Sequence, residues 1–389
     1  MIKNKTWDVF CKIIDNYGDI GVSYRLSKNL VELNQIVRMF VSELHPFKKI
    51  EPRIDTSKCE QIIDNIQIIL WDNSACSVSI LDSIVPSDII IEMFACNLPD
   101  NYLFHITDKS IWINLEYLSA EDWVEECHEK MSFSNGHFKY FFFPGFTDKT
   151  GGLNFEQNLI TKQSQGKQIG KQIIETKYGI DKIVSRNTLC CSIFCYENKT
   201  ILSLLANVDE NIIFIVPEGV FSAYLMRYSE LYRITVLDGS LMVNQFGVYI
   251  KIIPMTNQHD YDQLLISCDL NIVRGEDSFV RAQILSTPFF WNIYQQIDNA
   301  HLKKLDDFLE KYKVCVDDDQ LFESLVYISN SLNTPTYEYD NSIFYKVHFI
   351  NILQNLEKLQ NSATRWQNRI MKIGTLARNL ILFAQSSEK

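Results

Sequence analysis

The segment Arg274-Gly-Glu-Asp-Ser278 is the clearest candidate for a ligand site in this sequence of 389 residues. It follows a short apolar run and precedes a helix-like pattern, so we predict a strand, a tight turn and a helix start. The free N–H groups of a helix start and the planar cation of Arg274 suit phosphate oxygens. Glu276 and Asp277 would repel phosphate, so we expect them to face ribose or sugar hydroxyls. The segment predicts a nucleotide-sugar site. A capped helix whose arginine pairs with a carboxylate is the open alternative.

A second candidate is the turn Asp15-Asn-Tyr-Gly-Asp19-Ile-Gly21, which separates an apolar run from a helical pattern. Its two carboxylates could divide the work, with one as a general base while the other orients a substrate. Asn16, Tyr17 and Gly18 lie between them and are candidate substrate contacts, because glycine lets the backbone approach a ligand. The glycine spacing is not that of a dinucleotide-binding motif. In the alternative interpretation, the aspartates only form the turn and cap the helix.

The length of the chain predicts two domains, because a single hydrophobic core rarely grows beyond about 250–300 residues. We expect an N-terminal domain at 1–154, a polar interdomain linker at 155–186 and a second domain at 187–365. The C-terminal helix, 366–389, should pack back onto the first domain. Ligands of such α/β folds bind at the carboxyl ends of the strands. We therefore predict an α/β fold with two Rossmann-like domains that face a central cleft.

The expected strands are short apolar runs bounded by turn residues. In the first half they are 7–14, 37–42, 66–71, 89–94 and 111–115, and in the second half 188–195, 212–217 and 248–253. Residues 22–33 have helical spacing, so the first forty residues predict a strand–helix–strand unit and hence a parallel sheet.

The composition argues against several classes of partner. The 37 basic and 48 acidic residues give a net charge of -11, which repels nucleic acid and anionic membranes. The pattern of the first residues does not predict a secretion signal, and no apolar run reaches roughly 18 residues, so we expect a cytoplasmic protein. The ten cysteines are expected to be reduced thiols, with neither disulfides nor zinc.

The segments Asp260-Tyr-Asp262 and Asp317-Asp-Asp319 precede helical patterns, and we interpret them as helix caps rather than metal ligands.

Four long motifs resemble one family. They are Trp7-Asp-Val-Phe-Cys11 with the turn that follows it, Tyr117-Leu-Ser-Ala-Glu-Asp-Trp-Val124, Tyr140-Phe-Phe-Phe-Pro-Gly-Phe-Thr-Asp-Lys-Thr-Gly-Gly152 and Cys268-Asp-Leu-Asn-Ile-Val-Arg-Gly-Glu-Asp-Ser-Phe-Val-Arg-Ala-Gln283. Together they are similar to the bacterial protein-arginine rhamnosyltransferases that modify elongation factor P. The resemblance implies a GT-B fold. It also implies an inverting transfer of L-rhamnose from dTDP-β-L-rhamnose to an arginine of elongation factor P, without a metal or another cofactor.

The resemblance also implies roles for individual residues. Asp19 matches the general base and Asp15 its partner in the same turn. Glu276 is the third expected catalytic residue. The residues expected to bind the donor nucleotide are Arg274, Asp277, Ser278, Tyr196, Gln258 and Tyr294. Met255 departs from the family, because an aromatic residue is expected there against the thymine. Two other functions stay open: a GT-B transferase with another donor or acceptor, and a nucleotide-sugar-binding protein without catalysis.

Overall fold

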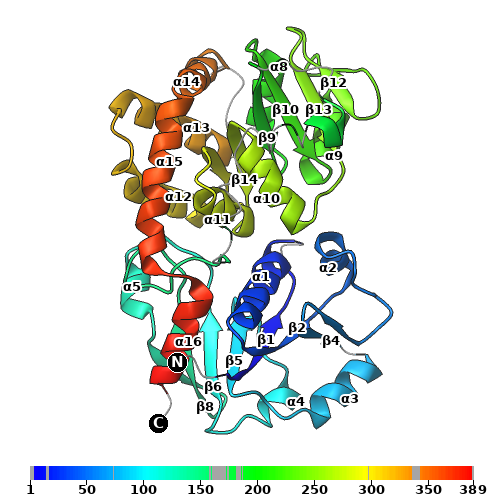
Figure 1. Cartoon of the computed structure of the whole chain (residues 1–389), viewed down its shortest axis with the longest axis vertical. Helices are drawn as coiled ribbons and strands as arrows, with labels where there is room; N and C mark the ends of the chain where they lie inside the picture. The colour runs from blue at the N-terminus through cyan, green and yellow to red at the C-terminus, as the bar shows by residue number, and fades with distance from the viewer. Residues whose placement is uncertain are drawn as a thin grey trace. The chain divides into compact units, whose positions relative to one another are not determined.

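The protein is described here from a computed structural model (Figure 1). It describes residues 4–14, 17–72, 74–156, 175–180, 187–296, 298–334 and 342–387, with the single positions 159, 172 and 185. The chain divides into two compact units, Met1–Gln157 with Ile370–Lys389, and Asn158–Arg369. Most of the expected linker, 155–186, lies outside the described residues.

The first unit contains an eight-stranded sheet in the order β3-β4-β2-β1-β5-β6-β8-β7. The pairs β3–β4 and β7–β8 are antiparallel, and the other neighbours are parallel. Its strands are β1 (Thr6–Cys11), β2 (Ile36–Val41), β3 (Glu60–Ile63), β4 (Ile66–Leu70), β5 (Ile89–Met93), β6 (Ile111–Leu115), β7 (Met131–Ser134) and β8 (His137–Phe142). The chain leaves β1 toward β2 on one side and later returns to β5 on the other. The edge beyond β1 and β5 is therefore the topological switch point, where ligands of such sheets bind.

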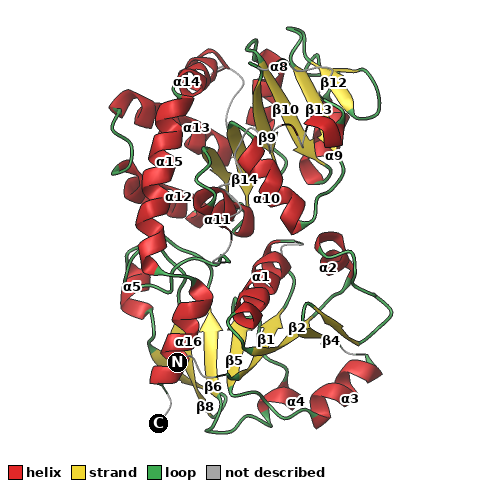
Figure 2. Cartoon of the chain, in the orientation of Figure 1, coloured by secondary structure: helices red, strands yellow, loops and turns green. Residues whose placement is uncertain are grey.

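Helices cover both faces of this sheet (Figure 2). One core contains Val9, Ile91 and residues of α1 (Gly18–Glu32) and α16 (Leu376–Ser386). The opposite core contains Phe10, Phe40 and residues of α3 (Ala75–Ser83) and α4 (Asp100–Leu103). The unit also has the short helices α2 (His45–Ile50) and α5 (Trp123–Cys127). Because β1 and β5 are covered on both faces, they read in the sequence as nearly continuous apolar runs.

The second unit contains a seven-stranded sheet in the order β11-β12-β13-β10-β9-β14-β15. The strands from β13 to β15 in this order run parallel, and β11 and β12 form an antiparallel edge. They are β9 (Leu189–Ile193), β10 (Ile212–Pro217), β11 (Thr235–Val236), β12 (Leu241–Val243), β13 (Tyr249–Ile253), β14 (Leu270–Arg274) and β15 (Phe289–Asn292). The strand order reverses between β9 and β14, which gives this unit its own switch point.

The described helices of the second unit lie between its strands in the chain or follow its last strand, β15. They are α8 (Lys199–Asn207), α9 (Val220–Tyr228), α10 (Gln258–Ser267), α11 (Asp277–Ile284), α12 (Ala300–Lys313), α13 (Asp319–Asn333), α14 (Ser342–Gln354) and α15 (Leu356–Ile370). The prediction that the acidic segment near Asp318 caps a helix is confirmed, since its side chain accepts a hydrogen bond from the Leu321 N–H at 3.0 Å. On α15, the buried Trp366 donates to Gln283 of the same unit at 2.7 Å.

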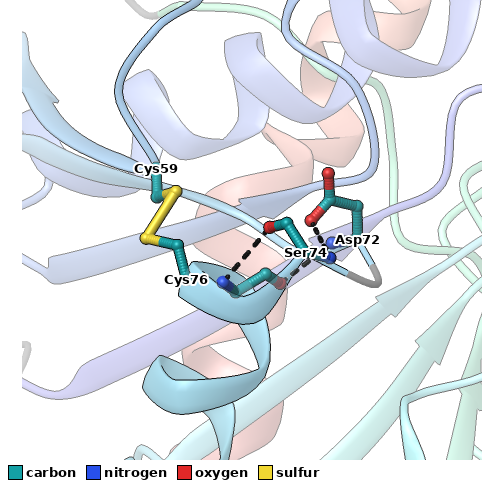
Figure 3. Close-up of a disulfide and its surroundings, with 5 residues drawn as sticks. Cys59, Asp72, Ser74 and Cys76 are labelled. Carbon is teal, nitrogen blue, oxygen red and sulfur yellow. Dashed lines mark hydrogen bonds between the residues drawn. A yellow bond between two sulfur atoms is a disulfide. The ribbon is translucent and has the colours of Figure 1, made fainter.

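The prediction that all cysteines are thiols is wrong for Cys59 and Cys76, which form a disulfide (Figure 3). Their Cα atoms lie 6.5 Å apart, and the bond joins the residue before β3 to the second residue of α3. The start of α3 is also held by Ser74, whose side chain accepts from the Ser77 N–H and whose own N–H donates to Asp72. Sequence spacing carries no information on this pairing, because it arises only when the edge hairpin and α3 pack together. No helix in the described part of the chain has the length and apolar character needed to cross a membrane.

Candidate functional site

Asp19 lies in the first turn of α1, directly beyond the carboxyl end of β1. It is only 2% exposed. Its Oδ2 atom accepts a hydrogen bond from the Ile14 N–H at 2.8 Å, and its Oδ1 atom accepts one from the Tyr117 hydroxyl at 3.2 Å. Both oxygens are thus held in a defined orientation at the switch point of the first sheet. A helix start also favours a negatively charged side chain.

Tyr117 is a site residue that the sequence reasoning did not assign to Asp19. It follows β6, and its ring stacks on that of Phe94, with centroids 4.0 Å apart and planes 6° apart. Phe94 follows β5 and has a left-handed backbone with φ of 56°, which ends the strand and turns the ring toward Tyr117. Three neighbouring parallel strands therefore place Asp19, Phe94 and Tyr117 at one edge of the sheet.

The other residues of the first candidate turn are only partly described. Asp15 and Asn16 lie outside the described residues, so their assigned roles stay predictions. Tyr17 precedes α1, and its carbonyl accepts from the Gly21 N–H at 3.0 Å. The Tyr17 side chain packs against the core of the first unit, while Gly18 is the first residue of the helix. In the structure Tyr17 therefore has a packing role.

Arg274 ends β14 and is 7% exposed. Its guanidinium carbon lies 4.5 Å from the ring centroid of Phe194 and 4.7 Å from that of Tyr196. Tyr196 in turn packs edge-on against Tyr294, with centroids 5.6 Å apart. These aromatic contacts hold the planar guanidinium against two rings, and a guanidinium can bind phosphate oxygens in a fork.

The predicted strand, turn and helix start at residues 274–278 is confirmed. Gly275 supplies the left-handed turn with φ of 60°, and its carbonyl accepts from the Trp291 indole at 2.8 Å. The Ser278 hydroxyl accepts from the Arg274 N–H at 3.1 Å and donates to the Arg274 carbonyl. Glu276 occupies the N-cap position of α11, but its side chain does not cap the helix. The turn is therefore closed by Ser278.

Four strand ends of the second sheet carry the remaining candidates. Tyr196 follows β9, Arg274 ends β14, Tyr294 follows β15, and Gln258 begins α10 after β13. Because these strands are parallel, all four residues lie on the carboxyl edge of the sheet. An open pocket of about 550 Å³ is lined by Met255, by its neighbours Pro254 and Thr256, and by Asp260 of α10.

Beneath this edge, Arg281 and Asp262 form a buried ion pair between α11 and α10. Both guanidinium contacts are present, with Nε to Oδ1 at 2.9 Å and Nη2 to Oδ2 at 2.6 Å. The pair ties together the two helices whose first turns carry Gln258 and Ser278. The prediction that Asp260-Tyr-Asp262 caps a helix is wrong, because Asn257 caps α10 and these aspartates lie inside it. Asp260, in the first turn of α10, forms an ion pair with Lys177, with Oδ2 and Nζ 2.9 Å apart. Within the described residues, no group of three His, Cys, Asp or Glu side chains could hold a metal ion.

Comparison with known proteins places this geometry in a family. Residues 7–385 match the family model described as "Elongation-Factor P (EF-P) rhamnosyltransferase EarP". A protein-arginine rhamnosyltransferase of Pseudomonas putida is 39% identical, with 81% of this chain and 83% of that protein covered. Another, of Shewanella oneidensis, is 34% identical with 98% of both chains covered.

Solved structures support the same family and also show the fold. The structure described as the basis for EarP-mediated arginine glycosylation of translation elongation factor EF-P matches 99% of this chain, with a TM-score of 0.65 and 27% identity. The glycosyltransferase MurG of Acinetobacter baumannii matches 99% of the chain with a TM-score of 0.53 and 11% identity, which supports the GT-B fold alone. The chain therefore belongs to the elongation factor P rhamnosyltransferase family, the protein-arginine rhamnosyltransferases, and has a GT-B glycosyltransferase fold.

Proposed function

We propose that this protein transfers L-rhamnose from dTDP-β-L-rhamnose to an arginine side chain of elongation factor P, with inversion at the anomeric carbon. The proposal rests on one observation: each of the two sheets has, at its carboxyl edge, one of the two charged side chains that the reaction needs. Asp19 lies at the carboxyl edge of the first sheet, and Arg274 lies at the carboxyl edge of the second. Membership of the rhamnosyltransferase family supports the donor and the acceptor.

The acceptor poses the main chemical problem. A guanidinium group has a pKa above about 12, so it is protonated and is a poor nucleophile. In the proposed reaction, Asp19 holds the guanidinium in line with the anomeric carbon. It takes a proton as the bond from the guanidinium nitrogen to that carbon forms. We assign Asp15 as the second carboxylate of this turn. Tyr117 keeps the Asp19 carboxylate oriented through its hydrogen bond to Oδ1.

The leaving group is the second half of the reaction. As the bond from the anomeric carbon to the diphosphate oxygen breaks, its electron pair leaves with dTDP. Arg274 and the N–H groups at the start of α11 stabilise that charge. In this scheme, Ser278 also binds the diphosphate. Glu276 and Asp277 accept hydrogen bonds from hydroxyl groups of the sugar nucleotide. Tyr196, Tyr294 and Gln258 contact the nucleotide, and the pocket beside Met255 receives the base.

The test is a transfer assay with purified elongation factor P, dTDP-rhamnose and a chelator, read by intact mass and by the NMR anomeric configuration. The proposal predicts one added deoxyhexose with the α configuration. A gain with a different nucleotide sugar, and none with dTDP-rhamnose, would reject the donor. Tight binding of dTDP without transfer would instead favour a non-catalytic nucleotide-sugar-binding protein.

We also propose a cytoplasmic location with no nucleic-acid or membrane partner. The proposed acceptor is a translation factor, and the net charge of -11 disfavours polyanionic surfaces. Fractionation of cells that produce the tagged protein would check this, with activity expected in the cytosolic fraction.

A further inference from the structure

Tyr261 carries a buried hydroxyl that has no hydrogen-bond partner of adequate geometry in the described structure. The residue lies in the first turns of α10 and is 7% exposed. Its ring packs against Phe194, with centroids 5.4 Å apart, and Phe194 also packs against the Arg274 guanidinium. Buried hydroxyls nearly always have a partner, so this one needs an explanation.

The hydroxyl lies close to the turn that begins α11. Burial raises the pKa of Tyr261 well above its usual value, and the neighbouring Ser278 side chain and the Arg274 charge oppose that rise while Asp277 adds to it. The phenol therefore stays protonated at any physiological pH and keeps a proton that it can donate in a hydrogen bond. Two of these neighbours, Asp277 and Ser278, lie in the first turn of α11.

Ser278 has a single hydroxyl proton, and that proton is in use. The hydroxyl donates it to the Arg274 carbonyl while its oxygen accepts from the Arg274 N–H. If Ser278 is to donate to a phosphate oxygen, the proton must leave the carbonyl. The serine oxygen still has a second lone pair to accept another hydrogen bond.

We propose that Tyr261 is a positioning residue for the diphosphate of the donor. When Ser278 turns its proton toward a phosphate oxygen, the Tyr261 hydroxyl donates to the Ser278 oxygen. Tyr261, Ser278 and the phosphate then form a continuous chain of hydrogen bonds, in which each bond strengthens the next. The inference rests on the proposed function only for the identity of the ligand, a nucleoside diphosphate.

A purely structural role for Tyr261 makes the opposite prediction. If the residue only fills space between Phe194 and α11, then Tyr261→Phe removes an unpartnered polar atom and leaves nucleotide affinity unchanged or stabilises the fold. If the chain of hydrogen bonds forms, Tyr261→Phe weakens binding of dTDP about tenfold, because a bond that supports a charged ligand is lost.

The experiment is calorimetric titration of the full-length protein with dTDP and, separately, with thymidine, which lacks the phosphates. Tyr261→Phe should weaken dTDP binding about tenfold and leave thymidine binding unchanged. Ser278→Ala and the double variant should lose similar affinity to each other, since the two hydroxyls act through one chain. Tyr312→Phe is the matched control, because Tyr312 is also buried in the second unit but packs among Phe308 and Trp366.

Two outcomes would overturn the inference while the donor assignment stands. One is wild-type affinity of Tyr261→Phe for dTDP. The other is an equal loss of dTDP and thymidine binding, which would mean that the site as a whole is disturbed. If the wild-type protein binds no dTDP, the donor assignment fails and the inference fails with it. Transfer to an acceptor is not measured, so a failed acceptor assignment does not affect the result.

Discussion

The hydroxyl of Tyr117 donates a hydrogen bond to Asp19 Oδ1 at 3.2 Å, while its ring lies flat on Phe94. The two residues follow different strands and are 98 positions apart in the chain. Because Asp19 is 2% exposed, this bond is part of what orients its carboxylate.

Tyr117→Phe should lower kcat for transfer about tenfold and leave the KM for the sugar donor unchanged. The variant keeps the stack on Phe94 but loses the donor to Asp19, so the carboxylate is less well oriented for the guanidinium. Steady-state kinetics with a mass-spectrometric readout would measure this. Tyr140→Phe, in the same unit but packed on Phe383, is the control and should behave as wild type. An unchanged kcat for Tyr117→Phe would remove Tyr117 from the site.

Arg274→Lys should raise the KM for the sugar donor tenfold or more, although it conserves the charge. Lysine has no planar group to pack on the rings of Phe194 and Tyr196, and it cannot bind two phosphate oxygens in a fork. Binding of dTDP would be compared with that of Arg227→Lys, since Arg227 is an exposed arginine on α9. Equal affinities for the two variants would contradict the anion site.

The stability of the fold should fall at acidic pH because His128 becomes protonated. Burial lowers the pKa of this side chain to about 4, and its Nδ1 atom accepts from the Phe143 N–H at 3.0 Å, so it must be neutral in the fold. An unfolded histidine titrates near 6.5. The stability contributed by the neutral form is therefore complete above pH 6.5 and is lost as the pH falls toward 4. After allowance for partial screening, the loss is about 2 kcal/mol.

Urea unfolding at a series of pH values would measure the His128 effect. His128→Gln removes the titrating group and should flatten the stability profile between pH 6.5 and 4. His137→Gln, at the first residue of β8 in the same unit, is the matched control. If His128→Gln retains the wild-type slope, another group is responsible.

The disulfide between Cys59 and Cys76 should stabilise the first unit. Closing a loop with a sequence separation of 17 residues restricts the unfolded chain, and the expected contribution is up to about 3 kcal/mol. Hydrogen exchange of β3 and α3, with and without a reductant, would measure it locally. Cys59→Ser should resemble the reduced protein, and Cys127→Ser, at an exposed free thiol, should not. Identical exchange under both conditions would show that the bond adds no stability.

The sequence predicted most of the buried parallel strands, although β8 and β15 were not among the expected runs. The runs at Ile111–Leu115 and Ile212–Pro217 have the observed limits, because strands covered on both faces are continuously apolar. The antiparallel strands β3, β7, β11 and β12 were not predicted. Their residues are mostly exposed or half-buried, as in Thr235–Val236, and they lack an apolar signature.

The candidate site was predictable where a motif and a strand end coincide. The turn at Arg274 and Ser278 could be read from the change of pattern along the chain. The partners of those residues could not be predicted, because Phe194, Tyr261 and Trp291 come close to them only when strands and α10 pack together. Likewise, nothing near Asp19 in sequence indicates Tyr117. Local pattern thus locates a site, whereas the residues that orient it depend on tertiary packing.

The most direct test of the central claim is a comparison of wild type with Asp19→Asn by two readouts on the same preparations. The variant keeps the shape of the side chain but removes the carboxylate that accepts the proton. Wild type should add one deoxyhexose to elongation factor P. Asp19→Asn should slow transfer at least a thousandfold while binding dTDP with wild-type affinity. Transfer by Asp19→Asn at a rate near that of wild type would contradict the account.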